Sequence, residues 1–469
     1  MTRFQLRHAL AAAVVLAVVA APAAPVAAQD FTRYVALGDS LGAGFLNGGL
    51  AIHPQERSYP ALIARQAGVG AGFEQPLISE PGIPPLLTIT GFAGGSPVIV
   101  PRSNQPGAPL NLNLPRPYNN LSVPGFDTHD VVATVTGNAL IDIVLRGQGT
   151  ALQQAAFLQP TFATVWIGNN DVLGAALSGR AIEGVTLTPV ADFERDYRTI
   201  LQTLTAVGAD LAVATVPNVT ALPYVTTVPP VVVNPATRQP VLINGQPVPL
   251  IGPDGPLSLA DRVLLPAASA LGQGIGIPAQ LGGTGQPLPD ELVLSAGELQ
   301  AILNRTNAIN GVIRQAASDF DAALWDANVF FDRVVREGLG VGGNIVYTTD
   351  FLTGGIFSYD GVHPTPFGYA VAANELIRAI NDHFGSDIPR VNLVPFVFGP
   401  DGSAGMAIET GPLGDGAPVF SQSAADQLLW SLRVERGKGS APEVRPADPA
   451  KKRPAQGKRP GRRGLRGRP

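Results

Sequence analysis

Short apolar runs alternate with longer segments of helical periodicity along most of the chain. Apolar residues dominate four runs of strand length, at residues 34–37, 161–167, 210–216 and 322–326. Such runs are typical of strands buried on both faces of a sheet. Helical spacing of apolar residues predicts helices at residues 58–66, 150–157, 191–207, 295–320, 327–337 and 366–384. This alternation predicts an α/β fold, with a mainly parallel sheet wrapped by helices on both faces.

Capping residues mark the start of several predicted helices. Ser58 begins the first of them, and Thr365 stands directly before Pro366 at the start of the last. A hydroxyl side chain followed by proline is typical of a helix N-terminus. Either Asp127 or Thr128 can cap a further helix in the same way.

Two long segments lack both kinds of periodicity. Gly, Pro and Asn dominate residues 67–117, and residues 221–289 are rich in Pro and Gly and low in charge. This composition predicts two insertions into the α/β core. Within the second insertion, Gly245 indicates a hairpin between residues 240–243 and 248–251.

The composition is that of an ordered globular protein with long loops. The chain has 469 residues, enough for one large or two ordinary domains, and it is 45% hydrophobic and 14% charged. It contains no cysteine, which excludes disulfides, a cysteine nucleophile, cysteine-based metal sites and a lipoprotein anchor. Stability must therefore come from a hydrophobic core, which a chain of this length can build.

The first 28 residues have the pattern of a secretory signal peptide. A basic start is followed by the apolar run at residues 9–21 and by small residues at 26–28. An uncleaved membrane anchor is the alternative, but Pro22 ends the apolar run well short of the ~20 residues that a span needs. We therefore expect cleavage near Ala28 and a protein that is secreted or held in the periplasm or cell envelope.

Charge is distributed unevenly between the body of the protein and its C-terminal tail. Residues 433–469 contain 13 of the 32 Lys and Arg residues but only 3 of the 36 Asp and Glu residues. The tail is rich in Pro and Gly, so we expect it to be disordered. An exported protein with an acidic body is an unsuitable partner for nucleic acid. We therefore expect the basic tail to contact anionic envelope surfaces instead.

Candidate chemistry centres on Ser40, which follows the first predicted strand. Open α/β sheets bind their ligands at the carboxyl ends of their strands. A serine nucleophile needs a base within hydrogen-bond distance. Of the five histidines, only His363 lies in a tight turn with a carboxylate, Asp360, three residues before it. Asp360 can orient one imidazole nitrogen and leave the other free to face Ser40.

Acyl transfer at a serine also requires donors for an oxyanion. The sequence offers the N–H groups of Ser40 and Gly125 and the side-chain amide of Asn170, which follows a buried strand. Taken singly, each of these stretches is equally well explained as a turn that ends a strand. Their order and context favour a shared site.

Four short motifs together resemble those of the SGNH, or GDSL-type, serine hydrolases. In the family's order, these motifs are Gly38-Asp39-Ser40-Leu41, Asn120-Leu121-Ser122-Val123-Pro124-Gly125, Gly168-Asn169-Asn170-Asp171 and Asp360-Gly361-Val362-His363. The resemblance covers residues 31–389 and is interrupted by the two insertions. It implies a three-layer α/β/α fold of flavodoxin-like type.

The resemblance also implies a role for each candidate residue. Ser40 would be the nucleophile, His363 the base and Asp360 the acid that orients the base. Ser40, Gly125 and Asn170 would form the oxyanion hole. No cofactor or metal is expected, because the glycines after Ser40 lack the Lys-Ser/Thr of a phosphate loop and no cluster of acidic residues and histidines has metal-ligand spacing.

The expected function is hydrolysis of carboxylic esters through an acyl-serine intermediate. We expect the two apolar insertions to form the walls or the lid of an acyl pocket. Such a pocket favours a lipid or other small-molecule acyl ester as substrate. A polysaccharide O-acetyl esterase is one alternative. A non-catalytic, exported binding or surface protein on a hydrolase scaffold is an alternative of another class. The sequence does not indicate an oligomeric state.

The expected organisation of the chain follows from these patterns. A signal peptide at residues 1–28 precedes an SGNH-type hydrolase domain at residues 29–390. A C-terminal extension at residues 391–432, with a hairpin and a short helix, precedes the basic tail at residues 433–469.

Overall fold

The computed structural model describes residues 29–93, 96–235, 237–342, 345–398 and 419–432. The signal peptide and the basic tail that the sequence predicts lie outside these residues. Within the described part of the chain, no helix is long and apolar enough to cross a membrane.

A four-stranded parallel sheet forms the centre of the molecule. Its strands are, in spatial order, β1 (Tyr34–Gly38), β4 (Phe162–Trp166), β5 (Asp210–Ala214) and β12 (Ala323–Trp325). All three pairings are parallel, so the carboxyl ends of the four strands lie at one edge of the sheet. The four strands predicted from the apolar runs are confirmed, and β1 and β4 are buried along their whole length.

Residues 119–123 run alongside β1 and extend the sheet beyond it. The N–H of Leu121 donates to the carbonyl of Ala36, and the N–H of Val123 donates to the carbonyl of Gly38. This pairing places the turn at Gly125 next to the carboxyl end of β1. The strand-like piece expected before this turn is therefore present, although only Ala36 and Asn120 form a β-bridge.

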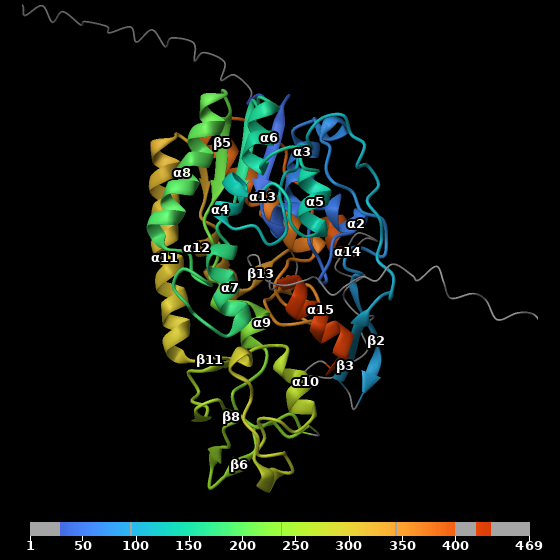
Figure 1. Cartoon of the computed structure of the whole chain (residues 1–469), viewed down its shortest axis with the longest axis vertical. Helices are drawn as coiled ribbons and strands as arrows, with labels where there is room; N and C mark the ends of the chain where they lie inside the picture. Colours follow the sequence, from blue (N-terminus) through green and yellow to red (C-terminus); the bar gives the residue numbers. More distant parts are fainter. Residues whose placement is uncertain (1–28, 94–95, 236, 343–344, 399–418, 433–469) are drawn as a thin grey trace, which may run out of the picture.

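Helices cover both faces of the sheet and produce three layers (Figure 1). Side chains alternate along β1: Tyr34 and Ala36 pack into one core cluster, and Val35 and Leu37 pack into the other. The helices of the first layer are α3 (Tyr59–Gln66) and α13 (Pro366–Phe384). The helices of the opposite layer are α4 (Thr128–Ala133), α6 (Ala151–Phe157), α8 (Val190–Ala206) and α11 (Ala296–Asp319). The three-layer α/β/α fold expected from the sequence is thus observed.

The helix starts follow the predicted caps. Ser58 is the N-cap residue of α3, although its side chain makes no capping hydrogen bond, and the side chain of Thr365 caps α13. Of the two candidates before α4, Asp127 is the cap, and it forms a capping box with Asp130. Short helices that the periodicity did not reveal are α1 (Ser40–Ala43), α2 (Ile52–Gln55), α5 (Ala139–Leu145), α7 (Asn170–Ser178), α9 (Pro223–Thr226) and α10 (Ala267–Gly272).

The first insertion contains an antiparallel hairpin, and one strand of this hairpin pairs with a strand of the C-terminal extension. Its strands are β2 (Leu87–Ala93) and β3 (Ser96–Pro101), and β15 (Val419–Phe420) pairs in parallel with β3. The extension also contains α14 (Val394–Phe398) and α15 (Gln422–Leu432). The hairpin expected within this extension is not formed by its described residues, because β15 pairs with the insertion.

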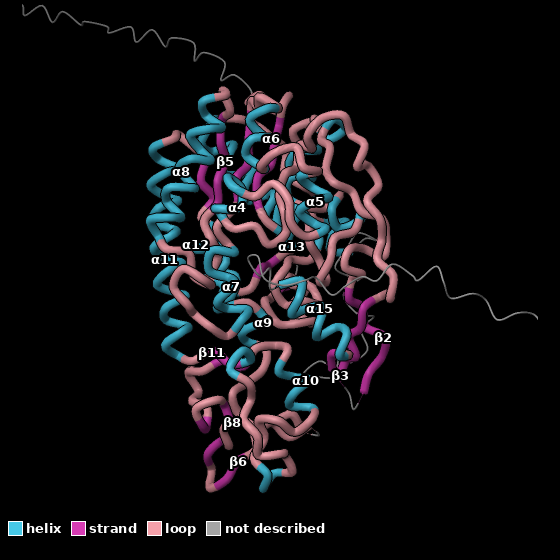
Figure 2. The backbone as a smooth tube through the Cα atoms, viewed as in Figure 1, coloured by secondary structure: helices cyan, strands magenta, loops and turns pink. Residues whose placement is uncertain are grey.

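The second insertion has a small hydrophobic core of its own. Val228, Leu250, Val263 and Leu288 are buried in it. It forms the protruding end of the molecule below α11 in Figure 1, and Figure 2 shows that most of it is loop. Within it, β6 (Leu242–Ile243) pairs with β7 (Gln246–Pro247) and β8 (Ile251–Gly252) pairs with β9 (Gly255–Pro256). Its last strand, β10 (Arg262–Val263), pairs with β11 (Val293–Leu294), which follows the insertion. The hairpin predicted around Gly245 is therefore confirmed.

Candidate active site

Ser40 lies directly beyond β1, at the carboxyl edge of the sheet. Asp39 is the N-cap of α1, and its Oδ1 atom accepts the N–H of Leu41 at 2.9 Å. Ser40 is the first residue of this helix, so its own N–H has no intrahelical acceptor. Gly42 permits close packing here, because a Cβ atom at this position would lie 2.1 Å from the Oγ atom of Ser122. The small residues around Ser40 thus fit a tightly packed turn.

The structure brings Ser40, His363 and Asp360 into one chain of hydrogen bonds. The Nε2 atom of His363 lies 2.8 Å from the Oγ atom of Ser40, and its Nδ1 atom lies 3.0 Å from the Oδ2 atom of Asp360. Both His363 and Asp360 are buried. A carboxylate accepts hydrogen bonds, so Nδ1 carries the proton and Nε2 is free to accept the proton of Ser40. This arrangement can activate a serine hydroxyl.

The turn from Asp360 to His363 is held by its own carboxylate. The Oδ1 atom of Asp360 accepts the N–H groups of Val362 at 2.9 Å and His363 at 2.8 Å. Gly361 has φ of 73°, and a Cβ atom there would lie 3.0 Å from the backbone nitrogen of Tyr224. Burial alone would raise the pKa of Asp360, but the neighbouring His363 and these N–H groups hold that pKa below its ordinary value. Asp360 is therefore an ionised acceptor beside His363.

Asn170 and Gly125 lie on two segments that reach the same edge of the sheet. The Nδ2 atom of Asn170, the first residue of α7, donates to the carbonyl of Phe126 at 2.8 Å. Gly125 has φ of 84°, which glycine adopts readily. Among the described residues, neither the N–H of Gly125 nor the second proton on Nδ2 has an acceptor. Together with the N–H of Ser40, these groups are the candidate donors for an oxyanion.

The turn that contains Gly125 is fastened to α7. The N–H and the hydroxyl of Thr128 donate to the Oδ2 atom of Asp171, at 3.0 and 2.8 Å. Asp171 is fully buried, and burial raises its pKa to about 6. Asn170 and Asp171 therefore hold consecutive parts of the same turn, one through Phe126 and the other through Thr128.

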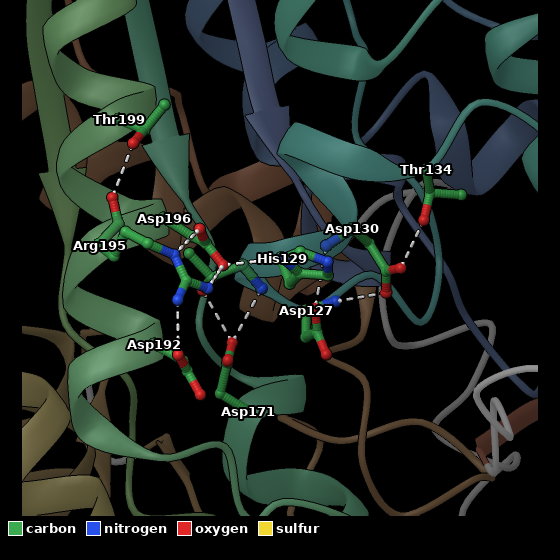
Figure 3. A network of polar contacts seen from close by, with 10 residues as sticks. Asp127, His129, Asp130, Thr134, Asp171, Asp192, Arg195, Asp196 and Thr199 are labelled. Atoms are coloured by element: carbon green, nitrogen blue, oxygen red, sulfur yellow. Dashed lines mark hydrogen bonds and ion pairs between the residues drawn. The ribbon is translucent and has the colours of Figure 1, made fainter.

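A polar network extends from this turn to α8 (Figure 3). The Nδ1 atom of His129 lies 2.9 Å from the Oδ2 atom of Asp196. Arg195 contacts Asp196 and Asp192, its neighbours on the same helix. His129 is half exposed in this arrangement, and the histidine that faces Ser40 is His363. We assign this network to fixing α4 against α8.

Two contacts near the candidate site were not foreseen from the sequence. Asn169 donates from Nδ2 to the Oδ2 atom of Asp39 at 2.8 Å, and Gly48 donates its N–H to the Oδ2 atom of Asp360 at 2.9 Å. Burial raises the pKa of Asp39 to about 6, and the hydrogen bond from Asn169 opposes this effect. The dipeptide Asn47-Gly48 is a recognisable turn signal. No local pattern marks Asn169 apart from its place before Asn170.

An apolar cavity of about 110 Å³ opens at Ser40 and His363. The polar residues that line it are Ser40, Asn169 and His363, and the others are mostly aromatic or aliphatic. Its walls include Phe330, Phe331 and Val334 of α12 (Ala327–Glu337) and Phe367 and Val371 of α13. Further lining comes from Leu339, in the short hairpin of β13 (Leu339–Gly340) and β14 (Val346–Tyr347).

The insertions contribute little to this cavity. Among the described residues of the two insertions, the second provides only Leu222 to the lining and the first provides none. The expectation that the insertions form the walls of the pocket is therefore wrong. Much of the wall comes from α12 and α13, because these helices pack at the carboxyl ends of β12 and its neighbours.

A family model described as GDSL-like Lipase/Acylhydrolase matches residues 34–376. No curated protein matches the sequence.

Several solved structures are similar to the chain. One is a GDSL-like lipase from Parabacteroides merdae, which is 13% identical. The match covers 76% of this chain and 97% of the lipase chain, with a TM-score of 0.34. Another is a lipase/acylhydrolase from Enterococcus faecalis, 12% identical, which covers 76% of this chain and 100% of its own with a TM-score of 0.31. A third is a variant of an acetyl-xylooligosaccharide esterase from Geobacillus Stearmophilus, 11% identical, which covers 76% of this chain and 96% of its own with a TM-score of 0.32.

Proposed function

The chain belongs to the GDSL-like lipase/acylhydrolase family, and we propose that it hydrolyses carboxylic esters through an acyl-serine intermediate at Ser40. The observation that carries this proposal is the chain of hydrogen bonds from Ser40 through His363 to Asp360. A non-catalytic binding protein on the same scaffold would have no need for a buried, ionised Asp360 behind a histidine that faces a serine. The proposed reaction requires no cofactor.

The proposed reaction begins with attack of Ser40 Oγ on the ester carbonyl carbon. His363 Nε2 takes the hydroxyl proton, and Asp360 stabilises the imidazolium that forms. The carbonyl oxygen becomes an oxyanion, which accepts hydrogen bonds from the N–H groups of Ser40 and Gly125 and from Asn170 Nδ2. As the carbon–oxygen bond to the alcohol breaks, His363 returns its proton to the leaving alkoxide.

Release of the acyl group repeats these steps with water. His363 Nε2 removes a proton from a water molecule, whose oxygen attacks the carbonyl carbon of the acyl-serine. A second oxyanion forms at the same donors. The bond to Ser40 Oγ then breaks, His363 returns the proton to Ser40, and the carboxylic acid leaves.

The substrate that the cavity favours is an ester with a compact apolar group. An engineered apolar cavity of roughly 150 Å³ binds benzene, so the space of about 110 Å³ here suits an acyl chain of roughly four to six carbons. Among the residues that the structure describes, the polar lining is limited to Ser40, Asn169 and His363, which leaves few groups to recognise a sugar. This observation favours a lipid or other acyl ester over an O-acetylated polysaccharide.

Export is part of the same proposal and is supported by the sequence alone. The pattern of residues 1–28 indicates a signal peptide, so the substrate would be met outside the cytoplasm or in the cell envelope. The basic tail would then contact anionic envelope surfaces.

Nitrophenyl esters of increasing acyl length test the catalytic proposal. Wild-type protein should hydrolyse them with the highest kcat/KM at roughly four to six acyl carbons, in line with the cavity volume. Ser40→Ala should reduce hydrolysis to the background rate. Equal rates for the wild type and Ser40→Ala would overturn the catalytic assignment, and a marked preference for acetate would overturn the substrate assignment.

A further inference from the structure

A tight turn at residues 46–49 contacts Asp360, the proposed catalytic acid. The N–H of Leu46 donates to the carbonyl of Gly49 at 3.0 Å, and the N–H of Gly49 donates to the carbonyl of Leu46 at 3.1 Å. The two central residues, Asn47 and Gly48, have φ of 51° and 74°. Positive φ at both positions and the Asn-Gly pair are the features of a type I′ turn. The local sequence therefore sets the shape of this turn.

This turn makes hydrogen bonds to three successive residues that end at Asp360. The N–H of Asn47 donates to Ser358 Oγ at 3.1 Å, and Asn47 Oδ1 accepts the N–H of Tyr359 at 2.8 Å. The N–H of Gly48 donates to Asp360 Oδ2 at 2.9 Å. The same Oδ2 atom faces His363 Nδ1. The side chains of Asn47, Ser358 and Asp360 are all buried, so water does not substitute for these contacts.

The C-terminal helix α15 and the first insertion both donate hydrogen bonds to this turn. Gln427 of α15 donates from Nε2 to the carbonyl of Gly48 at 3.3 Å and to the carbonyl of Pro85 at 2.7 Å. The N–H of Leu87, in the first insertion, donates to the carbonyl of Asn47 at 2.8 Å. Figure 1 shows α15 beside β3 of that insertion, and its residues Ala424 and Leu428 are buried in the main core.

We propose that Asn47 is a positioning residue for the Asp360–His363 pair, and that Gln427 extends this support to α15. The inference rests on the proposed function. Asn47 fixes the backbone at Ser358 and Tyr359, and its turn aims the Gly48 N–H at Asp360 Oδ2. A carboxylate held on both oxygens keeps the orientation that stabilises a protonated His363 during the reaction. The C-terminal extension thereby contributes to catalysis without contacting the substrate.

Two variants remove the support with little change in shape. Asn47→Gly keeps a residue that adopts positive φ but removes the acceptor for the N–H of Tyr359. Gln427→Leu keeps most of the side-chain volume and removes both hydrogen bonds to carbonyls. Ser423→Ala is the matched control, because Ser423 is an exposed residue of the same helix. Each variant is assayed for kcat and KM on a nitrophenyl ester and for the rate at which a fluorophosphonate labels Ser40.

The expected result is a loss in kcat with KM nearly unchanged. Asn47→Gly should lower kcat about tenfold and Gln427→Leu about threefold, the range for one or two hydrogen bonds near a buried charge. Labelling of Ser40 should slow in parallel, and Ser423→Ala should match the wild type. A drop in melting temperature without a change in kcat would show a purely structural role and overturn the inference.

A double-mutant cycle tests whether Asn47 acts through Asp360. In an Asp360→Asn background, Asn47→Gly should change kcat by less than about twofold, because the carboxylate it positions is gone. The same tenfold loss in both backgrounds would overturn the inference. Wild-type protein that neither hydrolyses esters nor reacts with fluorophosphonate would overturn the proposed function itself. Active wild-type protein with unaffected variants would overturn only the role of Asn47 and Gln427.

Discussion

The Nε2 atom of His363 lies 2.8 Å from the Oγ atom of Ser40, although the two residues are 323 positions apart. Ser40 follows β1, and the turn of His363 immediately precedes α13, which packs on the same sheet. The contact therefore depends on the register of the whole α/β core. Catalysis should respond both to the side chains in contact and to the groups that hold them.

Asp360→Asn should reduce kcat less than His363→Ala does. An asparagine at position 360 still offers an oxygen to the N–H groups of Val362 and His363, whereas His363→Ala removes the base itself. We expect losses of about 10²-fold and 10⁴-fold, respectively, at saturating substrate. Steady-state kinetics on one nitrophenyl ester would measure both. Equal losses would mean that the acid is as necessary as the base.

Asn170→Ala should lower kcat by about 10²- to 10³-fold with little change in KM, because the lost donor acts mainly on the oxyanion. Steady-state kinetics would again provide the measurement. The control is Asn374→Ala, since Asn374 also makes side-chain hydrogen bonds to backbone, with Val391, but lies far along α13. An Asn170 variant with wild-type kcat would remove this residue from the proposed oxyanion hole.

Gly42→Ala should destabilise the protein by about 1–3 kcal/mol, because a Cβ atom would lie 2.1 Å from Ser122 Oγ. Urea denaturation would measure the free energy of unfolding. Adding Ser122→Gly should restore part of the loss by removing the clashing side chain. Gly311→Ala is the control: Gly311 is in α11 and has no atom within 4 Å of an added Cβ, so alanine there should stabilise slightly. No loss in Gly42→Ala would contradict the packing argument.

Asp171 should make the protein more stable as the pH falls from about 6 towards 4. Burial raises its pKa to about 6 in the folded protein, against 3.8 for an ordinary aspartate. Between these values the folded state binds more protons than the unfolded chain, so lower pH favours folding. Asp171→Asn should therefore reduce the gain in unfolding free energy over this range by about 1–2 kcal/mol.

Urea denaturation at several pH values from about 4 to 7 would measure this dependence. Asp254→Asn is a suitable control, because Asp254 is exposed. Burial also raises the pKa of Asp39 to about 6. Asp39 is present in both variants, so the difference between their pH dependences of unfolding free energy reports the contribution of Asp171 alone. Identical pH dependence in Asp171→Asn and the wild type would contradict the prediction.

Val334→Phe should shift the substrate preference toward shorter acyl groups. Val334 lines the apolar cavity, so a larger side chain should lower kcat/KM for a hexanoate ester about tenfold relative to acetate. Val335→Phe is the matched control: Val335 is the next residue of α12, 40% exposed, and does not line the cavity. A competition assay with both esters would measure the ratio. An unchanged ratio in Val334→Phe would mean that the acyl group binds elsewhere.

The sequence by itself determined the strands of the sheet, most of the long helices and the positions of the candidate residues. These features depend on interactions within short windows. Apolar runs are buried as strands, Thr365 caps the helix that Pro366 begins, and the carboxylate of Asp360 closes its own turn onto His363. Family resemblance at four motifs added the roles proposed for Ser40, Gly125 and Asn170.

Only the tertiary structure decided what surrounds these residues. α12 and α13 line much of the cavity, β15 pairs with β3, and Gln427 supports a turn more than 370 positions earlier in the chain. Such contacts are chosen by burial and hydrogen-bond satisfaction across the whole core, and a local pattern does not encode the partner. Asn47-Gly48 illustrates the division: the dipeptide indicates a tight turn, but only the fold places that turn against Asp360.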